Sequence, residues 1–76
     1  MKRPLRPHEV LPSELTPKER RMTPMLAQDW STDEIAVTLQ LTPETVELYR
    51  ASIYRKLGTD DPTALARWVI HHQVTD

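Results

Sequence analysis

The strongest constraint on the fold of this chain is a pair of predicted helices separated by a very short turn. The longer helix spans residues 43–57. Thr42 can cap its first turn, Pro43 suits the first helical position, and Gly58 can adopt the left-handed conformation that ends a helix. A shorter helix is predicted just upstream, over residues 32–39. Two helices joined by so tight a turn are typical of a helix-turn-helix, whose second helix usually enters the major groove of DNA.

Capping patterns predict where the other helices begin. Thr16 and Glu19 have the spacing of a capping box at the start of a first helix. Ser31 and Glu34 repeat that spacing before the second helix. Asp61, followed by a proline, can cap a fourth helix. Helical periodicity then predicts the inward-facing side chains, which are Leu15, Met22, Met25 and Leu26; Ile35, Ala36 and Leu39; Val46, Ile53 and Leu57; and Leu65, Trp68, Val69 and His72.

Pro24 lies inside the first predicted helix. A proline there removes a backbone hydrogen bond and clashes with the preceding turn, which costs about 3 kcal/mol or more if nothing relieves it. We therefore expect a kink at Pro24, or an early end of the helix followed by a restart.

Residues 1–15 are predicted to form an extended arm that precedes a domain over residues 16–76. The arm is rich in proline and has little periodicity, which leaves two interpretations open. It is either a disordered leader or a segment that contacts DNA through its basic side chains. Those side chains are Lys2, Arg3 and Arg6.

Length and composition indicate one small all-α domain. Seventy-six residues leave no room for a second core, and the sequence shows neither a strand pattern nor a glycine-rich loop. The chain has no cysteine, which excludes disulfides and thiolate metal sites. No apolar run approaches the roughly 20 residues of a membrane span, so we expect a cytoplasmic protein without a membrane partner.

Four short motifs occur in order along the chain: Leu15-Thr16-Pro17-x-Glu19-Arg20, Ser31-x-x-Glu34-Ile35-Ala36, Leu41-Thr42-Pro43-x-Thr45-Val46 and Arg50-x-x-Ile53-x-x-Lys56-Leu57-Gly58. In this order and spacing, the chain resembles the LuxR/GerE-type helix-turn-helix from about Leu15 to His72. The resemblance implies a four-helix bacterial DNA-binding domain that regulates transcription. It also implies that the fourth helix often pairs two domains into a homodimer. We expect a standalone version, similar to GerE-like spore regulators, because the sequence shows no sensor segment.

The chain departs from the family pattern at several positions. Glu47 stands where the family usually has lysine or arginine, and Ala51 where a basic or polar residue is common. Asp29 and Gln40 stand where the family commonly has glycine, and Tyr49 where it commonly has histidine. Since glycine suits turn positions that need a positive φ, we expect strain at Gln40 of about 1 kcal/mol and less at Asp29.

The third helix is predicted to carry the DNA-binding residues. A family-like docking places Glu47, Leu48 and Ala51 at base edges. Nearer the DNA backbone it places Thr42, Thr45, Arg50 and Arg55. Glu47 can accept a hydrogen bond from a cytosine amine, and Leu48 or Ala51 can contact a thymine methyl. A purely structural interpretation is that Glu44 and Glu47 favour the positive end of the helix dipole.

The charge distribution keeps a second function open. Ten basic and eleven acidic residues give a net charge of -1, and the predicted reading helix lies in the more acidic part of the chain. An exposed Leu48 among acidic residues also suits a protein surface. The alternative function is therefore a helix-turn-helix that binds another transcription regulator. A sigma-factor-like promoter reader is a third candidate, although the helix after Gly58 favours the LuxR/GerE type.

The remaining chemical side chains indicate neither an enzyme nor a cofactor site. Asp60 and Asp61 are adjacent carboxylates, but no nucleophile or base accompanies them. His71 and His72 point about 100° apart on a helix, so they cannot share a metal ion. We expect His72 to face inward and His71 outward. The resemblance suggests a dimer interface, for which we expect Trp68, Ile70 and His71.

Overall fold

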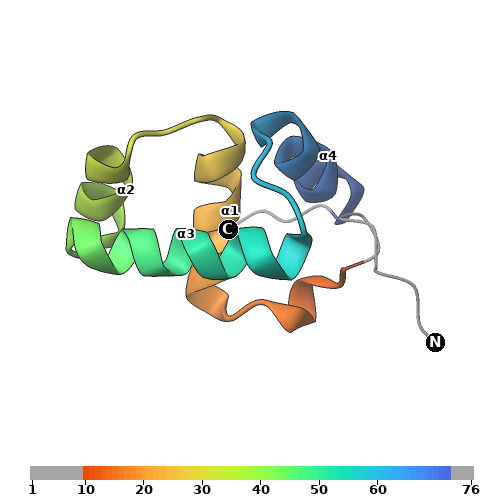
Figure 1. Cartoon of the computed structure of the whole chain (residues 1–76), viewed down its shortest axis with the longest axis horizontal. Helices are drawn as coiled ribbons and strands as arrows, with labels where there is room; N and C mark the ends of the chain where they lie inside the picture. The colour runs from red at the N-terminus through yellow and green to blue at the C-terminus, as the bar shows by residue number, and fades with distance from the viewer. Residues whose placement is uncertain (1–9, 73–76) are drawn as a thin grey trace.

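The computed structural model describes residues 10–72, and within that range it contains four α-helices and no strand. In chain order the elements are the short 3-10 helix η2 (Pro12–Glu14), α1 (Pro17–Ala27), α2 (Thr32–Leu39), α3 (Pro43–Leu57) and α4 (Pro62–His72). Figure 1 shows α3 running across the front, with α1 behind it, α2 near one end and α4 near the other. The prediction of an all-α, four-helix domain is therefore confirmed.

The predicted capping interactions form as hydrogen bonds. The hydroxyls of Thr16, Ser31 and Thr42 each accept from the backbone N–H three residues later, at 3.1 to 3.2 Å. The carboxylates of Glu19 and Glu34 accept in return from the N–H of the cap residue. These bonds satisfy N–H groups that a helix start leaves without partners. The starts of α1, α2 and α3 are thus determined by side chains within the same four residues.

The turns use a left-handed backbone at Gly58, as the sequence predicted, and at Asp29 and Gln40, as the family resemblance implied. Asp29 has φ 62° and Gln40 has φ 58°, while Gly58 ends α3 at φ 70°. Asp29 and Gln40 adopt this conformation although neither is glycine. Gln40 directly joins α2 to the turn before α3, so the relative orientation of these helices depends on a strained residue.

Helix α1 continues past Pro24 to Ala27. The early end that we expected as one outcome is therefore wrong, and the kink that we expected as the other stays a prediction. Residues on both sides of the proline are buried, Met22 before it and Leu26 after it. The hydroxyl of buried Thr23 also donates to the Glu19 carbonyl at 2.8 Å, within the same helix. This packing holds the last turn in place and offsets the hydrogen bond that Pro24 cannot make.

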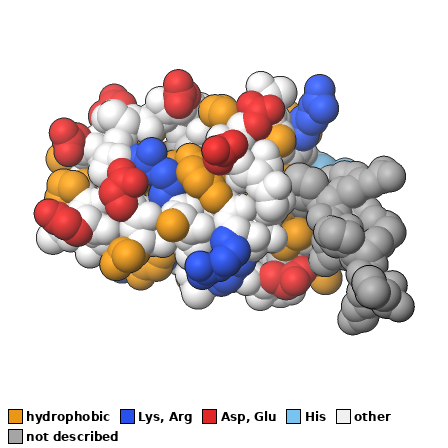
Figure 2. All heavy atoms as spheres, viewed as in Figure 1, with side chains coloured by type: hydrophobic (Ala, Val, Ile, Leu, Met, Phe, Trp, Pro, Cys, Tyr) orange, Lys and Arg blue, Asp and Glu red, His pale blue; other side chains and the backbone are white. Residues whose placement is uncertain are grey.

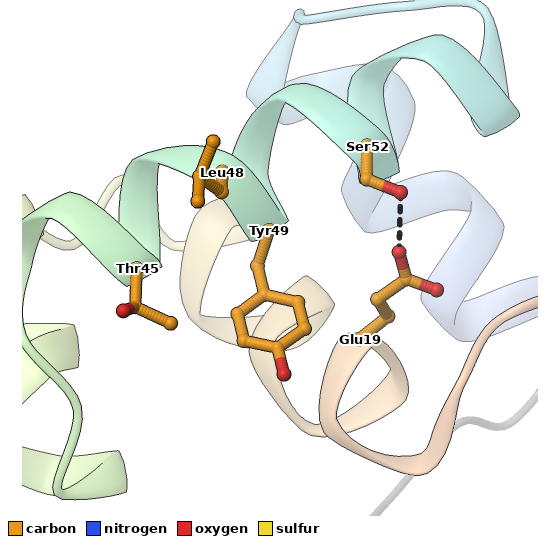
Figure 3. Close-up of a pocket in the computed structure, with 5 residues that line it drawn as sticks. All are labelled: Glu19, Thr45, Leu48, Tyr49 and Ser52. Carbon is orange, nitrogen blue, oxygen red and sulfur yellow. Dashed lines mark hydrogen bonds between the residues drawn. The ribbon is translucent and has the colours of Figure 1, made fainter.

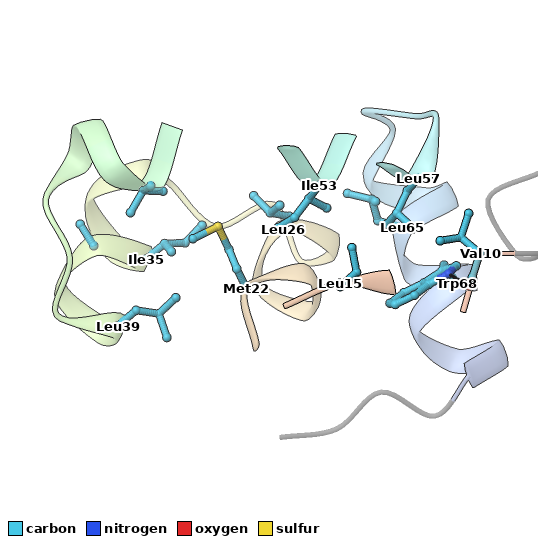
Figure 4. Close-up of a cluster of buried hydrophobic side chains, with 12 residues drawn as sticks. Val10, Leu15, Met22, Leu26, Ile35, Leu39, Ile53, Leu57, Leu65 and Trp68 are labelled. Atoms are coloured by element: carbon cyan, nitrogen blue, oxygen red, sulfur yellow. Dashed lines mark hydrogen bonds between the residues drawn. The ribbon is translucent and has the colours of Figure 1, made fainter. Parts of the chain in front are cut away.

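The core is a single cluster of apolar side chains to which all four helices contribute (Figure 4). Its fully buried apolar members are Met22, Ile35, Val46, Ile53, Leu57, Leu65 and Trp68. Most of the inward positions predicted from periodicity are buried, which confirms the assignment of helix faces. Met25, Val69 and His72 are only partly buried.

The segment before α1 packs against the domain rather than extending from it. Val10 and Leu15 are buried, and the Trp68 indole donates to the Val10 carbonyl at 2.7 Å. Arg20 donates to the carbonyls of Pro12 and Leu15. The expectation of an extended arm over residues 1–15 is thus wrong for residues 10–15, because the side chains of Val10 and Leu15 complete the core. Residues 1–9, with their predicted DNA-contacting basic side chains, lie outside the described residues.

Candidate nucleic-acid interface

The outward face of α3 is free of contacts with the core of the domain. Leu48 is 73% exposed, and Ala51 and Glu47 are also exposed. Val46 and Ile53, on the opposite side of the same helix, are completely buried. Leu48 therefore lies on the surface of the domain, on the side of α3 that faces away from the core.

A buried carboxylate fixes α3 against α1. Glu19 is only 2% exposed, and it accepts hydrogen bonds from the Ser52 hydroxyl at 2.5 Å and from the Lys56 ammonium at 2.8 Å. It also accepts from the N–H of Thr16. Burial alone raises the pKa of Glu19, but the hydrogen bonds from Lys56, Ser52 and Thr16 and the Lys56 charge together lower it. The ionised Glu19 therefore sets the rotation of α3 about its axis.

A shallow pocket of about 330 Å³ lies beside this anchor, between α1 and α3 (Figure 3). It is lined by Glu19, Thr45, Leu48, Tyr49 and Ser52. Tyr49 extends from α3 toward α1, and the dashed bond in Figure 3 joins Ser52 to Glu19. Within this pocket, Glu19 accepts hydrogen bonds from Lys56 and Ser52, so the polar groups of Glu19 and Ser52 are used to join α1 to α3.

A second polar cluster joins α3 to the first residue of α2. Thr32 donates its hydroxyl proton to Glu47 at 2.5 Å and accepts a hydrogen bond from Arg50. The Arg50 guanidinium also forms an ion pair with Glu47 at 3.3 Å. The Nε of Arg50 is buried and has no hydrogen-bond partner among residues 10–72. Arg50 therefore acts first as an intramolecular contact between the two helices.

Several basic side chains near α3 are already engaged. Arg50 pairs with Glu47, Lys56 with Glu19, and Arg20 donates to backbone carbonyls. Arg55, by contrast, is exposed and makes no hydrogen bond or ion pair within residues 10–72. Figure 2 shows acidic side chains spread over the face that α3 forms, with basic side chains in separate places between them. A phosphate backbone meets little uncompensated positive charge on this face.

The structure brings most of the predicted DNA-binding residues to one helix face but gives them different surroundings. Glu47, Leu48, Ala51 and Arg55 are exposed, whereas Thr45 and Arg50 are half-buried. Thr42 is exposed, and its hydroxyl lies 2.8 Å from that of Thr45. These two threonines are thus partly occupied with the helix cap.

The predicted dimer residues do not share one surface. Ile70 is 74% exposed and His71 is exposed, whereas Trp68 has no exposed area. Its indole lies in the core, bonded to Val10 and with its centroid 5.1 Å from that of His72. Trp68 therefore cannot contact a second subunit through its side chain, and the sequence-based assignment needs this correction. Periodicity alone already placed Trp68 on the inner face of α4.

Sequence reasoning missed the two polar clusters that hold α3. The sequence indicates Glu19 as part of a capping box and of the first family motif, but not as a contact to α3, and it does not single out Thr32. A signal for the first cluster was present, because Ser52 and Lys56 are four residues apart and so share a helix face. Nothing in the sequence pairs Thr32 with Arg50, since that contact depends on how α2 crosses α3.

The luxR family of bacterial regulatory proteins matches residues 13–69. This chain belongs to that family. It is 43% identical over 53 residues to the transcriptional regulatory protein UhpA of Escherichia coli, covering 70% of this chain and 27% of that protein. It is also 43% identical over 58 residues to the probable HTH-type transcriptional regulator GfsR of Streptomyces halstedii, covering 75% of this chain and 24% of that protein. No solved structure gave a significant match.

The LuxR-family assignment and the names of these relatives support a role in DNA-binding transcriptional regulation. The response regulator Rre1 of Synechocystis is 30% identical over 63 residues, covering 83% of this chain and 27% of that protein. The chain thus spans about a quarter of the length of these relatives. Within residues 10–72, no helix has the length and apolar character needed to cross a membrane. That same range holds no group of three side chains that could bind a metal ion.

Proposed function

We propose that this domain binds double-stranded DNA through the exposed face of α3 and thereby regulates transcription, as a non-enzymatic cytoplasmic protein. The observation that supports this function most directly is the exposure of Leu48 and Ala51 on the second helix of a helix-turn-helix. An α-helix fits the width of the DNA major groove, and there its outward side chains meet the base edges.

In this docking, Glu47, Leu48 and Ala51 contact the bases. Leu48 and Ala51 can pack against thymine methyl groups, which gives specificity without charge. Arg55 reaches the phosphate backbone, as do the hydroxyls of Thr42 and Thr45. Arg50 contributes through Glu47, to which it is paired, more than through a phosphate. Phosphate contacts supply much of the affinity of DNA-binding proteins, so a single domain is expected to bind weakly.

A homodimer compensates for such weak binding, because it doubles the contacts and fixes two half-sites at a set spacing. The exposed side of α4, with Ile70 and His71, is the surface we propose for the pairing. A large exposed aliphatic side chain in the last turns of a surface helix suits an interface between subunits.

Light scattering coupled to size-exclusion chromatography, with and without random genomic DNA fragments, tests DNA binding and oligomeric state together. A salt titration of the complex then measures the phosphate contribution. The logarithm of the binding constant should fall linearly with the logarithm of salt concentration, with a slope of roughly −0.9 per phosphate contacted. Absence of any complex at low salt would contradict the proposal.

A specific observation also favours the second candidate, binding to another transcription regulator. Leu48 is exposed on the same helix as the acidic residues Glu44 and Glu47, and an apolar side chain beside acidic ones suits a protein surface better than a phosphate backbone. That function predicts a complex with a partner protein that involves Leu48 and is unaffected by competing DNA. The same chromatography with the partner added distinguishes the two functions.

A further inference from the structure

One oxygen of Glu47 is held in place by two helices. Its Oε2 accepts from the Thr32 hydroxyl at 2.5 Å and lies 3.3 Å from Nη2 of Arg50. Arg50 also donates to the Thr32 oxygen, which closes a triangle of polar contacts. An exposed glutamate would otherwise sample many rotamers, so these contacts reduce its freedom before any ligand arrives.

The other oxygen of Glu47 remains available. Oε1 receives no hydrogen bond from residues 10–72, and the side chain of Glu47 is 56% exposed. An ionised carboxylate can only accept hydrogen bonds. In the major groove, cytosine presents its N4 amine as a donor, whereas adenine presents an amine beside the N7 acceptor. A carboxylate is repelled by the N7 lone pair, so the isolated donor of cytosine suits it better.

We propose that Thr32 and Arg50 position Glu47 to read a cytosine in the target site, with Oε1 accepting from the N4 amine. Glu47 is the base-contacting residue, and Thr32 is a positioning residue that acts through it. This inference depends on the proposed DNA-binding function. It explains how an acidic side chain on α3 can contribute specificity although it opposes the phosphates, because base contacts specify while phosphate contacts position.

The first test is selection of binding sites from a library of randomised DNA duplexes, with the wild type and the variants Glu47→Gln, Glu47→Ala, Thr32→Val and Thr32→Ser. The wild type should show a position that strongly prefers cytosine. In Glu47→Gln the preference for cytosine should fall by about 5-fold or more. The preference for adenine should rise, because an amide offers both a donor and an acceptor. Thr32→Val should weaken the cytosine preference, whereas Thr32→Ser should keep it.

Affinity for non-specific DNA separates positioning from folding. Thr32→Val should leave non-specific affinity within about 2-fold of the wild type, because it removes no charge that faces phosphate. Thermal unfolding of each variant confirms that the domain remains folded. A general loss of affinity at all sites, without a change at the cytosine position, would overturn the role of Thr32.

The second test replaces the selected cytosine with N4-methylcytosine, whose methyl group takes the place of the hydrogen in the major groove. The affinity of the wild type for the methylated site should fall to its affinity for a site with a different base pair at this position. Glu47→Ala should bind the cytosine site and the N4-methylcytosine site equally well. An unchanged cytosine preference in Glu47→Gln or Glu47→Ala would overturn this inference alone. Failure of the wild type to select any sequence would overturn the proposed function as well.

Discussion

At the scale of single residues, the buried carboxylate of Glu19 connects two helices. It caps α1 through the Thr16 N–H and joins that helix to α3 through Ser52 and Lys56. One charge thus serves both local and tertiary structure. Since the pKa of Glu19 is lowered in the folded domain, folding favours its ionised form.

This lowered pKa predicts a pH-dependent stability. The contribution of Glu19 is fully present above its ordinary pKa of 4.5 and is lost as the pH falls through the lower value in the folded state. Glu19→Gln should lower the free energy of unfolding at pH 7 by about 1–3 kcal/mol, because the ion pair with Lys56 is lost. Below the pKa of Glu19 in the folded state, the free energies of unfolding of the variant and the wild type should converge.

Urea unfolding at several pH values checks this expectation. Glu34→Gln is the matched control, because Glu34 is also a capping glutamate with a lowered pKa but is exposed. It should have a smaller effect. An equal pH dependence in the wild type and Glu19→Gln would show that Glu19 does not link folding to ionisation.

At the scale of elements, the turn between α2 and α3 determines which face of α3 reaches solvent. Gln40 caps α2 with a left-handed backbone, and the Leu41 N–H bonds to the Ala36 carbonyl at 2.9 Å. Thr42 then starts α3 at once. With so few residues between them, the two helices have little freedom to change their crossing angle.

Gln40→Gly should stabilise the domain by about 0.5–1 kcal/mol. Glycine adopts a positive φ without steric strain, and the strain that is relieved at Gln40 should exceed the extra conformational entropy that glycine loses on folding. Thermal unfolding should show a midpoint raised by about 2–8 °C for a domain of this size. Gly58→Ala is the converse control, since Gly58 has φ +70° and an added Cβ would meet no atom within 4 Å, so the substitution tests the backbone conformation alone. It should lower the midpoint. A lower midpoint for Gln40→Gly would contradict the strain at Gln40.

The acidic face of α3 predicts the effect of a charge reversal. Glu47→Lys should bind non-specific DNA more tightly. Its affinity should also depend more steeply on salt, and the increase in slope should correspond to roughly one additional phosphate contact. Fluorescence anisotropy at several salt concentrations measures both. Asp60→Lys makes the same charge change beyond the end of α3 and should have a smaller effect. Equal effects of the two variants would mean that α3 does not face the DNA.

At the scale of the whole molecule, the Trp68 indole joins α4 to the segment that precedes α1. It fills the core beneath α4 and bonds to Val10, which lies 58 residues earlier. The same burial leaves Ile70 as the large apolar side chain exposed on α4. Stability and pairing of subunits thus depend on different sides of one helix.

Ile70→Glu should therefore weaken a homodimer and leave the stability of the monomer nearly unchanged. A charge in the centre of an apolar interface loses its hydration without a partner, whereas an exposed position tolerates it. Sedimentation equilibrium with and without DNA measures the association. Val37→Glu is the control, because Val37 is 80% exposed but lies on α2. Equal dissociation constants for Ile70→Glu and the wild type would exclude this surface.

The sequence by itself determined the helices of this protein and which side of each faces inward. Caps such as Thr42 and the end of α3 at Gly58 depend on neighbouring residues, so local patterns reveal them, whereas the turns at Asp29 and Gln40 were indicated by the resemblance to the LuxR family. The exposure of Leu48 and Ala51 followed from the same periodicity.

Only the tertiary structure decided how α3 is held and what its polar side chains contact. The partners of Glu19 on α3 lie 33 and 37 residues away, and Thr32 meets Arg50 across 18 residues. Packing also carried α1 through Pro24 and drew Val10 into the core. These contacts depend on helix crossing angles, which result from the simultaneous burial of side chains from several helices and leave no local pattern in the chain.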